Sequence, residues 1–341
     1  MEEKSKRAIE EIRGILESGT KEFRSSDKWQ EYLTMQSKMP DYSPNNCLLI
    51  LMQTKGEASM CMGYKSWKQL GRYVKAGENG IKIICPAPKK IEVWQQKKDS
   101  EGNLIYHANG IPVREKVTRV IPYYKVGYTF DVSQTDGEPL PEICKRLEGE
   151  VEGAEELIEI LQKISPVPLT FEVIEGRANG YFSPLEQKIV VKEDLSPNHT
   201  IHTCLHEITH AMLFLNGTDA KASRELKETE AESVAFVVMK RLLGDQLTAE
   251  DLGQYSFGYL SSWASSDDLS EMQEAMQTIQ KTSLELINRI EEELKMWDLE
   301  KTSERVQDVP MKLESDAAGI CAKTPNSTTK VSKATSHVPH M

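Results

Sequence analysis

Apolar residues recur at helical spacing near the start of the chain and alternate with polar residues further along. Ala8, Ile9, Ile12 and Ile15 fall on one face of a helix, whereas IKIICP at 81–86 has the alternation of a strand. In this first part, helices are expected over residues 2–18, 27–37, 47–53 and 64–72, and strands over 81–86, 91–96 and 117–132, with 91–96 pairing with 81–86. The pattern predicts an α+β arrangement.

The second part of the chain alternates helical segments with short apolar strands. Ser196-Pro197 is typical of a helix start and Asn216-Gly217 of a helix end, so a helix is expected between them. Further helices are expected over 150–164, 221–243 and 270–297, and strands over 169–175 and 187–193 with the turn ANGYFSP between them. This part is also expected to be α+β.

Composition divides the chain into four segments. Residues 134–142, QTDGEPLPE, contain one glycine and two prolines and are typical of a linker. The residues after 301 are rich in Ser, Thr, Lys and Pro, a composition typical of disorder. We therefore expect a first domain over 1–133, a linker over 134–149, a second domain over 150–300 and a disordered tail over 301–341.

Length and cysteine usage narrow the class of protein. The 341 residues suit two domains, and no run approaches the ~18 apolar residues that a membrane helix needs. The charged start MEEKSKRAIEEIRG lacks the apolar segment of a secretion signal. The six cysteines are scattered with no CxxC pair, which indicates reduced, buried thiols. These features predict a cytoplasmic protein with no membrane partner.

The net charge of −11 is unevenly distributed along the chain. Residues 1–131 contain 22 Lys and Arg against 16 Asp and Glu, whereas residues 132–300 contain 14 against 33. A basic first part joined to an acidic second part indicates two modules with different partners. Chance fluctuation of charge is the simpler alternative.

Residues 205–214, LHEITHAMLF, carry the clearest chemical signal. His206 and His210 are one helical turn apart, so both imidazoles point the same way and can share one cation. Glu207 can reach a metal-bound water, take its proton and later pass that proton to a leaving amine. HExxH inside an apolar helix therefore predicts a zinc-peptidase site with Glu207 as general base.

A catalytic zinc needs a third protein ligand, and the next expected helix offers Glu228, Glu230 and Glu232. Glu228 and Glu232 share a face that flanks the apolar side of this helix, whereas Glu230 lies about 160–200° from each. We expect Glu228 to bind zinc and Glu232 to hold the free N–H of a ligand histidine. The reverse assignment and a solvated acidic face are the alternatives.

Other polar residues near the motif are weaker candidates. Ligands at i, i+4 and i+8 span ~12 Å of helix axis, so we expect His202 to be a surface or capping histidine. GYFSP at 180–184 resembles the edge strand on which zinc peptidases bind substrate backbone. Three tyrosines are candidate donors to an oxyanion, with packing as the simpler role for each: Tyr181, Tyr255 and Tyr259.

Between residues 55 and 98 lie ten Lys and Arg against three acids, with Tyr64, Trp67, Tyr73 and Trp94 interleaved. Cations follow phosphates and rings stack on unpaired bases, so this mixture suits single-stranded nucleic acid. A basic face over core aromatic residues, Trp67 above all, explains the same composition. The candidate contacts are Lys65, Trp67, Lys68, Arg72, Lys75 and Lys82.

Two segments resemble known families. The first contains Tyr42-Ser43, Asn46, Trp67, Gly71-Arg72, KAGENGI at 75–81 and VGYTFDVSQTDG at 126–137. With these pieces it resembles the N-terminal domain of ArdC-type antirestriction proteins of mobile elements, which implies single-stranded DNA binding. The second, HEITH followed by KETEAESVAF, resembles the metallopeptidase domain of ArdC and the gluzincin-like ImmA/IrrE peptidases. The second resemblance implies a third ligand four residues before an acidic or amide residue, a spacing that Glu228 and Glu232 fit.

With these resemblances, we expect a mobile-element protein that binds single-stranded DNA and carries a Zn²⁺-dependent metallopeptidase site. Its expected role is antirestriction, or protection of DNA during transfer. Two alternatives stay open: a DNA-protecting protein whose zinc is structural, and a peptidase that cleaves a regulatory protein. The acidic charge of the second part argues against DNA binding at the peptidase face.

Overall fold

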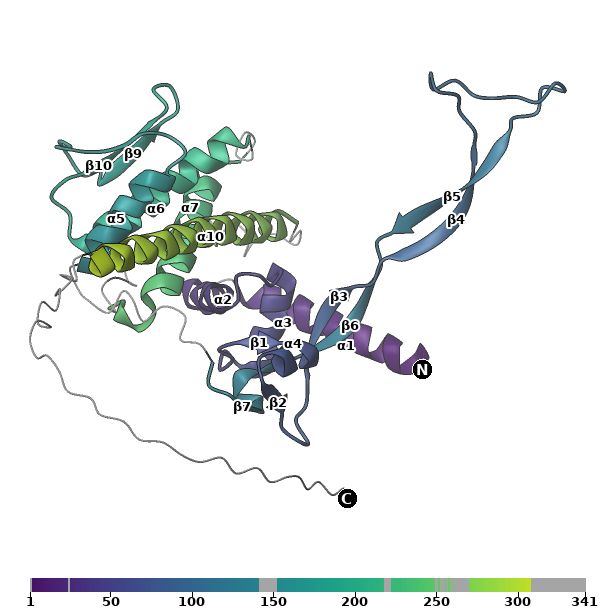
Figure 1. The fold of residues 1–341 in the computed structure, drawn as a ribbon, viewed down its shortest axis with the longest axis horizontal. Coiled ribbons are helices and arrows are strands. Elements are labelled where there is room, and N and C mark those ends of the chain that lie inside the picture. The colour runs from purple at the N-terminus through teal and green to yellow at the C-terminus, as the bar shows by residue number, and fades with distance from the viewer. Residues whose placement is uncertain are drawn as a thin grey trace, which may run out of the picture. The chain divides into compact units, whose positions relative to one another are not determined.

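Three helices begin the chain in this computed structural model, which describes residues 2–23, 25–140, 152–217, 222–248, 251, 255, 257, 260 and 270–307. They are α1 (Glu2–Glu22), α2 (Ser26–Lys38) and α3 (Pro44–Thr54) (Figure 1). The side chain of Ser25 caps α2, and Pro44 occupies the first turn of α3, where its missing N–H removes no intrahelical hydrogen bond. All three helices start or end beyond the expected bounds, but their existence was predicted.

Short strands of the first part form separate small sheets. One has the order β1 (Cys61–Met62), β6 (Tyr124–Asp131), β3 (Ile81–Pro86); another pairs β2 (Arg72–Val74) with β7 (Thr135–Gly137); a third pairs β4 (Lys89–Gln96) with β5 (Arg114–Ile121). The short helix α4 (Tyr64–Gln69) precedes β2, and the 3₁₀ turn η1 (Val132–Gln134) precedes β7. The strands β1, β2 and β7 were not predicted, because two or three residues are too few to show a period.

The expected pairing of 91–96 with 81–86 is wrong. Strand β3 pairs antiparallel with β6, and β4 pairs antiparallel with β5. Ile81 and Ile83 of β3 are buried and need a partner strand with a buried face. In β6 such a face exists, because Thr129 and Asp131 are buried, whereas no residue of β4 is buried. Strand β3 therefore pairs with β6, because both strands have a buried face.

The second part builds a three-stranded sheet against helices. Strand β10 lies between β8, to which it is parallel, and β9, to which it is antiparallel. Ile189, Val190 and Val191 of β10 are buried, and α6 packs on this strand and on β9. The elements are α5 (Glu152–Ile164), β8 (Leu169–Glu172), β9 (Gly180–Ser183), β10 (Lys188–Lys192), α6 (Pro197–Leu215), α7 (Arg224–Leu243), η2 (Gly244–Gln246) and α10 (Ser270–Gln307).

Two elements of the second part differ from the expected ones. The segment ANGYFSP, expected as a turn, contains strand β9, as the edge-strand interpretation of GYFSP required. Helix α10 continues to Gln307, past the expected start of the tail at 301. The rest of the tail, and the predicted linker from residue 141 onward, lie outside the described residues.

One hydrophobic core contains residues from both predicted domains. Trp29, Tyr32 and Leu33 of α2 are fully buried, and α2 packs against α7. The indole N–H of Trp29 donates to the hydroxyl of Ser233 on α7 at 3.0 Å. The chain divides into one compact unit of Met1–Met296 and a second of Trp297–Met341. A domain boundary at 134–149 therefore stays a prediction.

Two further properties of the described residues bear on the expectations. None of the described helices combines the length and apolarity needed to cross a lipid bilayer. Cys47, Cys61, Cys85 and Cys204 are free thiols, and all but Cys85 are buried. Burial raises the pKa of Cys61 and of Cys204 to about 12, so both thiols stay protonated near neutral pH.

Candidate metal centre

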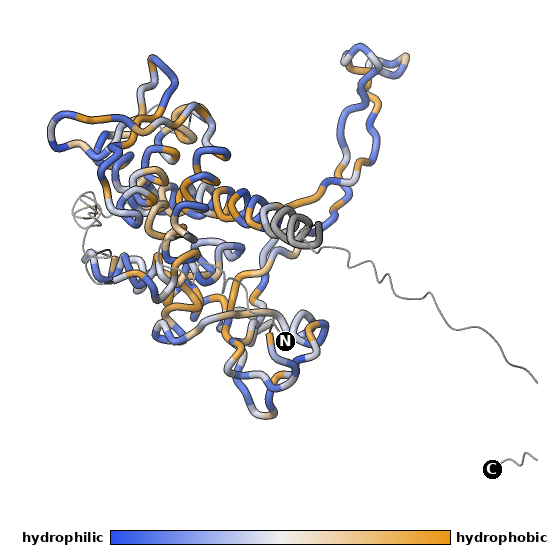
Figure 2. The backbone as a smooth tube through the Cα atoms, turned by 60° about the vertical axis from the view of Figure 1, so that its left-hand side comes forward, coloured by the Kyte–Doolittle hydropathy of each residue, from blue (hydrophilic) through white to orange (hydrophobic). Residues whose placement is uncertain are grey.

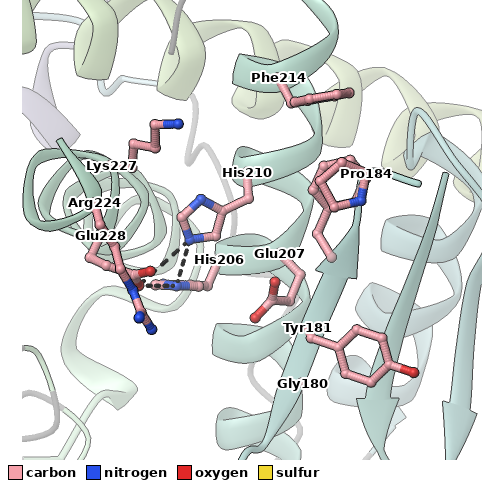
Figure 3. Close-up of a pocket in the computed structure, with 11 residues that line it drawn as sticks. Gly180, Tyr181, Pro184, His206, Glu207, His210, Phe214, Arg224, Lys227 and Glu228 are labelled. Atoms are coloured by element: carbon pink, nitrogen blue, oxygen red, sulfur yellow. Dashed lines mark hydrogen bonds and ion pairs between the residues drawn. The ribbon is translucent and has the colours of Figure 1, made fainter. Parts of the chain in front are cut away.

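Helix α6 presents both histidines of the HExxH motif toward α7. Ile201, Leu205 and Ile208 fill the opposite, fully buried side of the helix. His206 and His210 are one turn apart, and their Nε2 atoms lie 3.1 Å from each other. Figure 3 shows the two rings turned to the same point in a cleft. The helix therefore supplies two imidazole nitrogens to one position.

Glu228 of α7 supplies a third donor atom at this position. Its Oε2 lies 3.3 Å from Nε2 of His206 and 3.6 Å from Nε2 of His210 (Figure 3). Two ligands bound at ~2.0–2.1 Å to a tetrahedral zinc lie about 3.3 Å apart. The three donor atoms are thus spaced as the ligands of one divalent cation, and all three residues line the cleft.

Glu232 lies behind His206, away from this triangle. Its Oε2 is 3.0 Å from Nδ1 of His206 and 3.3 Å from Nε2 of His202. A carboxylate at Nδ1 fixes the tautomer that leaves Nε2 free to bind a cation. This arrangement is compatible with Glu228 as ligand and Glu232 as supporting carboxylate, and that assignment stays a prediction. Glu230 is buried rather than solvated.

The expectation that His202 is a surface or capping histidine is wrong. Its side chain is 16% exposed, and its ring packs edge-on against Tyr255 at 4.9 Å between centroids. His202, His206 and Glu232 also bring donor atoms close enough to hold a cation. Three histidines at i, i+4 and i+8 are too far apart to share one cation, but Glu232 reaches between His202 and His206. Spacing along one helix could not reveal that contact.

The charges of the site reinforce one another. Burial lowers the pKa of His206, but hydrogen bonds to Glu228 and Glu232 outweigh burial and raise it to about 10. Hydrogen bonds from His206 and His210 hold the pKa of Glu228 far below its usual range. Burial raises the pKa of Glu232, yet its histidine partners lower it overall to about 2. Both carboxylates are therefore anionic and favour a cation at this position.

Glu207 occupies the other side of the same cleft. Burial raises the pKa of its carboxyl group, against the opposing effect of the two imidazoles. The backbone N–H of Phe182 in β9 hydrogen-bonds to this carboxylate. A carboxylate whose pKa is raised toward neutrality is suited to accept and return a proton. Glu207 lies beside the ligand triangle and is not a member of it.

Strand β9 forms the wall of the cleft opposite α7. Its one described neighbour is β10, so its other edge is unpaired within the described residues. Gly180 lets the strand approach α6, because a Cβ there would lie 2.6 Å from Cγ2 of Thr203. The cleft has a volume of about 670 Å³. It is lined by Gly180, Tyr181, Phe182, Pro184, His206, Glu207, His210, Phe214, Arg224, Lys227 and Glu228.

Of the three candidate oxyanion donors, Tyr181 and Tyr255 lie among the described residues, and neither hydroxyl is directed at the ligand triangle. Tyr181 lines the cleft, but Figure 3 shows its hydroxyl pointing away from His206 and His210. Tyr255 is buried, and its hydroxyl lies 3.3 Å from the sulfur of Met239. Tyr259 lies outside the described residues. Packing is therefore the role that the structure supports for Tyr255.

Two cations of the cleft, Arg224 and Lys227, were missed from the sequence. Arg224 precedes Glu228 by four residues, so both lie on one face of α7, and Lys227 is next to Glu228. The helix spacing that selected Glu228 also pointed to Arg224. Cations near a helix N-terminus oppose its dipole, so their placement is not explained by helix stability.

The predicted nucleic-acid contacts fall into two groups. Lys65 and Lys68 are exposed on α4. Trp67 between them is fully buried, and its indole N–H donates to the carbonyl oxygen of Phe130 at 2.9 Å. The core interpretation of Trp67 is therefore the one the structure supports, and a base cannot reach its ring.

Arg72, Lys75 and Lys82 make internal contacts. The guanidinium of Arg72 donates to Thr135 Oγ1 at 2.9 Å and to the Thr135 carbonyl oxygen at 3.0 Å, which ties β2 to β7. The ammonium of Lys75 donates to the carbonyl oxygen of Ser133 at 2.9 Å. Lys82 forms an ion pair with Glu11 of α1. These three side chains already have structural roles.

Comparison with known proteins finds a family similar to the first part of the chain. Residues 2–130 match the family described as the N-terminal domain of anti-restriction factor ArdC. A Bacillus anthracis protein described as uncharacterized is 23% identical over 328 residues, which cover 86% of this chain and 53% of that protein. The chain thus spans about half the length of this relative.

Two crystal structures of the antirestriction ArdC protein from plasmid R388 are also similar. The metal-free structure is 18% identical, with a TM-score of 0.43, over 74% of this chain and 85% of that chain. The Mn(II)-bound structure is 19% identical, with a TM-score of 0.42, over 74% of this chain and 88% of that chain. Residues 2–130 are thus similar to the ArdC N-terminal domain, as the sequence motifs predicted.

Proposed function

We propose that this chain is an ArdC-like antirestriction protein that binds single-stranded DNA and carries a zinc-dependent metallopeptidase site. The match of residues 2–130 to the ArdC N-terminal domain supports the DNA-binding half. The convergence of His206, His210 and Glu228 within 3.1–3.6 Å, beside Glu207, carries the peptidase half. In this proposal the protein protects mobile-element DNA during transfer.

Each residue of the cleft has a distinct role in the proposed hydrolysis. Two imidazoles and one carboxylate suit Zn²⁺, and the same donor set also accepts Mn²⁺ or Fe²⁺. Binding of the cation would displace the proton that the two carboxylates favour on His206. The bound ion would supply Lewis acidity toward a peptide carbonyl and toward water. Glu207 accepts the proton of the attacking water and returns it to the leaving amine. Glu232 keeps His206 oriented.

The peptide would lie along β9. An extended chain can add to the unpaired edge of this strand by backbone hydrogen bonds, which aligns a peptide bond with the ligand triangle. Arg224 and Lys227 line the opposite side of the cleft and favour an acidic group in the substrate. This basic wall stands in a part of the chain that is acidic overall.

A cleavage assay with matched metal analysis tests the peptidase half. We expect the full-length protein to cleave β-casein, and chelation to abolish that cleavage. Glu207→Gln should lower the rate by about 10²- to 10⁴-fold, the usual contribution of a general base, while the bound metal is retained. Tyr181→Phe is the control, because the hydroxyl of this cleft residue points away from the histidines. Full activity of Glu207→Gln would contradict the proposed mechanism.

A second function is favoured by the packing of the ligand helix. Because α7 contributes to the shared core, a cation that joins α6 to α7 would stabilise the fold without turnover. A DNA-protecting protein with a structural metal then predicts that Glu207→Gln keeps antirestriction activity. Lys65→Glu with Lys68→Glu should lose that activity if α4 touches DNA. These lysines serve better than Arg72, which ties β2 to β7.

A further inference from the structure

Strands β4 and β5 form a two-stranded ribbon without a third strand among the described residues. Eight residue pairs join them, from Lys89 opposite Ile121 to Gln96 opposite Arg114. No residue of either strand is buried. Hydrophobic and hydrophilic residues alternate along this ribbon (Figure 2). A two-stranded hairpin without a covering layer is marginally stable in water, so the ribbon has a free surface for a partner.

Large apolar side chains are exposed along this ribbon and at its two ends. Trp94 is 63% exposed and Val120 is 61% exposed, and Tyr124, just beyond β5, is 59% exposed. Tyr106, in the connection between the strands, is 54% exposed. The ribbon therefore offers several exposed apolar side chains to a partner.

The register places Trp94 among cations on one face of the ribbon. Lys116 lies directly opposite Trp94, and its ammonium is 5.5 Å from the centroid of the indole. Lys90 and Arg114 lie on the same face, because side chains alternate along each strand. Glu92 is the one acid of this face, and it pairs with Lys116 at 3.2 Å. The face thus has a net positive charge around an exposed indole.

We propose that this face, defined by Lys90, Trp94, Arg114 and Lys116, is a binding site for single-stranded DNA. A base stacks on the indole of Trp94, and the neighbouring cations contact phosphates. This site rests on the DNA binding proposed above, and it assigns that binding to the β4–β5 ribbon. It differs from the site expected on α4, where Trp67 is buried and cannot stack.

The exposed indole decides between single-stranded and duplex DNA. A two-stranded ribbon fits the major groove of a duplex, where it reads the edges of paired bases. A ring that stands out from the face has no stacking partner there, because the bases of a duplex already stack on one another. Unpaired bases offer their faces to an indole, so the proposed ligand is a single strand.

Fluorescence anisotropy with the full-length protein and a labelled oligothymidine tests the site. We expect Trp94→Ala to weaken binding about 5- to 100-fold, the usual effect of removing one stacking ring. Trp94→Phe should retain most of the affinity, because a phenyl ring also stacks. Lys90→Glu with Arg114→Glu should weaken binding and reduce the salt dependence, by about 0.7 in the log–log slope for each phosphate that the variant no longer neutralises.

Tryptophan fluorescence supplies a readout that a structural role would not change. Oligothymidine should quench part of the wild-type emission, and Trp94→Phe should lose that quenching while it still binds. Tyr73→Ala is the control, since this tyrosine is 56% exposed on β2, outside the ribbon. Circular dichroism confirms that each variant folds.

The outcomes separate the site from the proposed function. Wild-type protein that binds neither oligothymidine nor duplex refutes the DNA-binding function itself. If wild-type protein binds oligothymidine and the Trp94→Ala variant binds it with the same affinity, the ribbon site alone is overturned. Duplex binding that is stronger than single-strand binding, and that is unchanged in Trp94→Ala, also overturns the ribbon site.

Discussion

Replacing Glu228 or Glu232 by alanine distinguishes the metal ligand from the residue that supports it. Oε2 of Glu228 lies 3.3 and 3.6 Å from the two ligand nitrogens, so Glu228→Ala removes one of three donor atoms. Glu232 contacts Nδ1 of His206 instead, at 3.0 Å. Loss of such a supporting carboxylate typically weakens metal binding about 10- to 100-fold, or about 1.4–2.7 kcal/mol. Glu228→Ala should weaken metal binding by more than that range.

Competition with a chelator of known affinity measures both effects on the full-length protein, and elemental analysis for zinc and manganese identifies the ion. His202→Ala supplies the decisive comparison, because His202 belongs to the alternative donor group with His206 and Glu232. In our assignment His202→Ala leaves the affinity within about tenfold of wild type, since it removes only a contact to Glu232. If Glu232→Ala and His202→Ala abolished metal binding and Glu228→Ala did not, our assignment would be refuted.

Three further substitutions test the fold, those of Asp131 and Ser233 by urea unfolding followed with circular dichroism and that of Gly180 by the cleavage and metal-binding assays. Asp131→Asn should cost about 1–3 kcal/mol at pH 7, because the buried carboxylate accepts four hydrogen bonds. Burial raises the pKa of Asp131, but those bonds lower it overall. Its contribution should therefore be present above the unfolded pKa of about 3.9, fade as pH falls through the lower folded pKa, and be missing from the variant. Gly180→Ala should displace β9 from α6, because the new Cβ would lie 2.6 Å from Thr203, and should impair cleavage more than metal binding. Ser233→Ala should cost about 0.5–1.5 kcal/mol by removing the acceptor of the Trp29 indole, and an unchanged midpoint would show that this bond is not stabilising.

The candidate metal centre was predictable to the extent that its geometry belongs to single helices. The spacing of His206 and His210 fixes two donors on one face of α6 whatever surrounds it. The choice of Glu228 over Glu232 also followed from helix spacing, with the family resemblance beside it. Helix spacing does not determine which side chains of α7 lie against which side chains of α6, so the contact of Glu232 with His202 was missed. That contact depends on how two helices pack.

Strand pairing in the first part was less predictable, since it depends on burial and not on periodicity. IKIICP and IEVWQQ both alternate, and nothing local states that only the first has a buried side. The burial of Trp67 was likewise not predictable from its neighbours in the sequence. Its basic neighbours Lys65 and Lys68 suggested a stacking ring, but Phe130 accepts its indole N–H in the core. Trp94, which stands between Val93 and Gln95 in the sequence, is exposed.

Helix α7 joins the two halves of the proposed function. One side of it holds Glu228 in the cleft, and Ser233, five residues on, accepts the indole N–H of Trp29 from α2. Those five residues span about 7.5 Å of one helix, so the ligand and the packing contact move together. Residues 2–130, which match the ArdC domain, include both α2 and the β4–β5 ribbon. Cutting the chain between the predicted domains would remove α2 from the shared core and disturb the metal centre as well as DNA binding. Experiments that separate the two activities therefore need single side-chain substitutions at Glu207 and Trp94, because a domain truncation changes both at once.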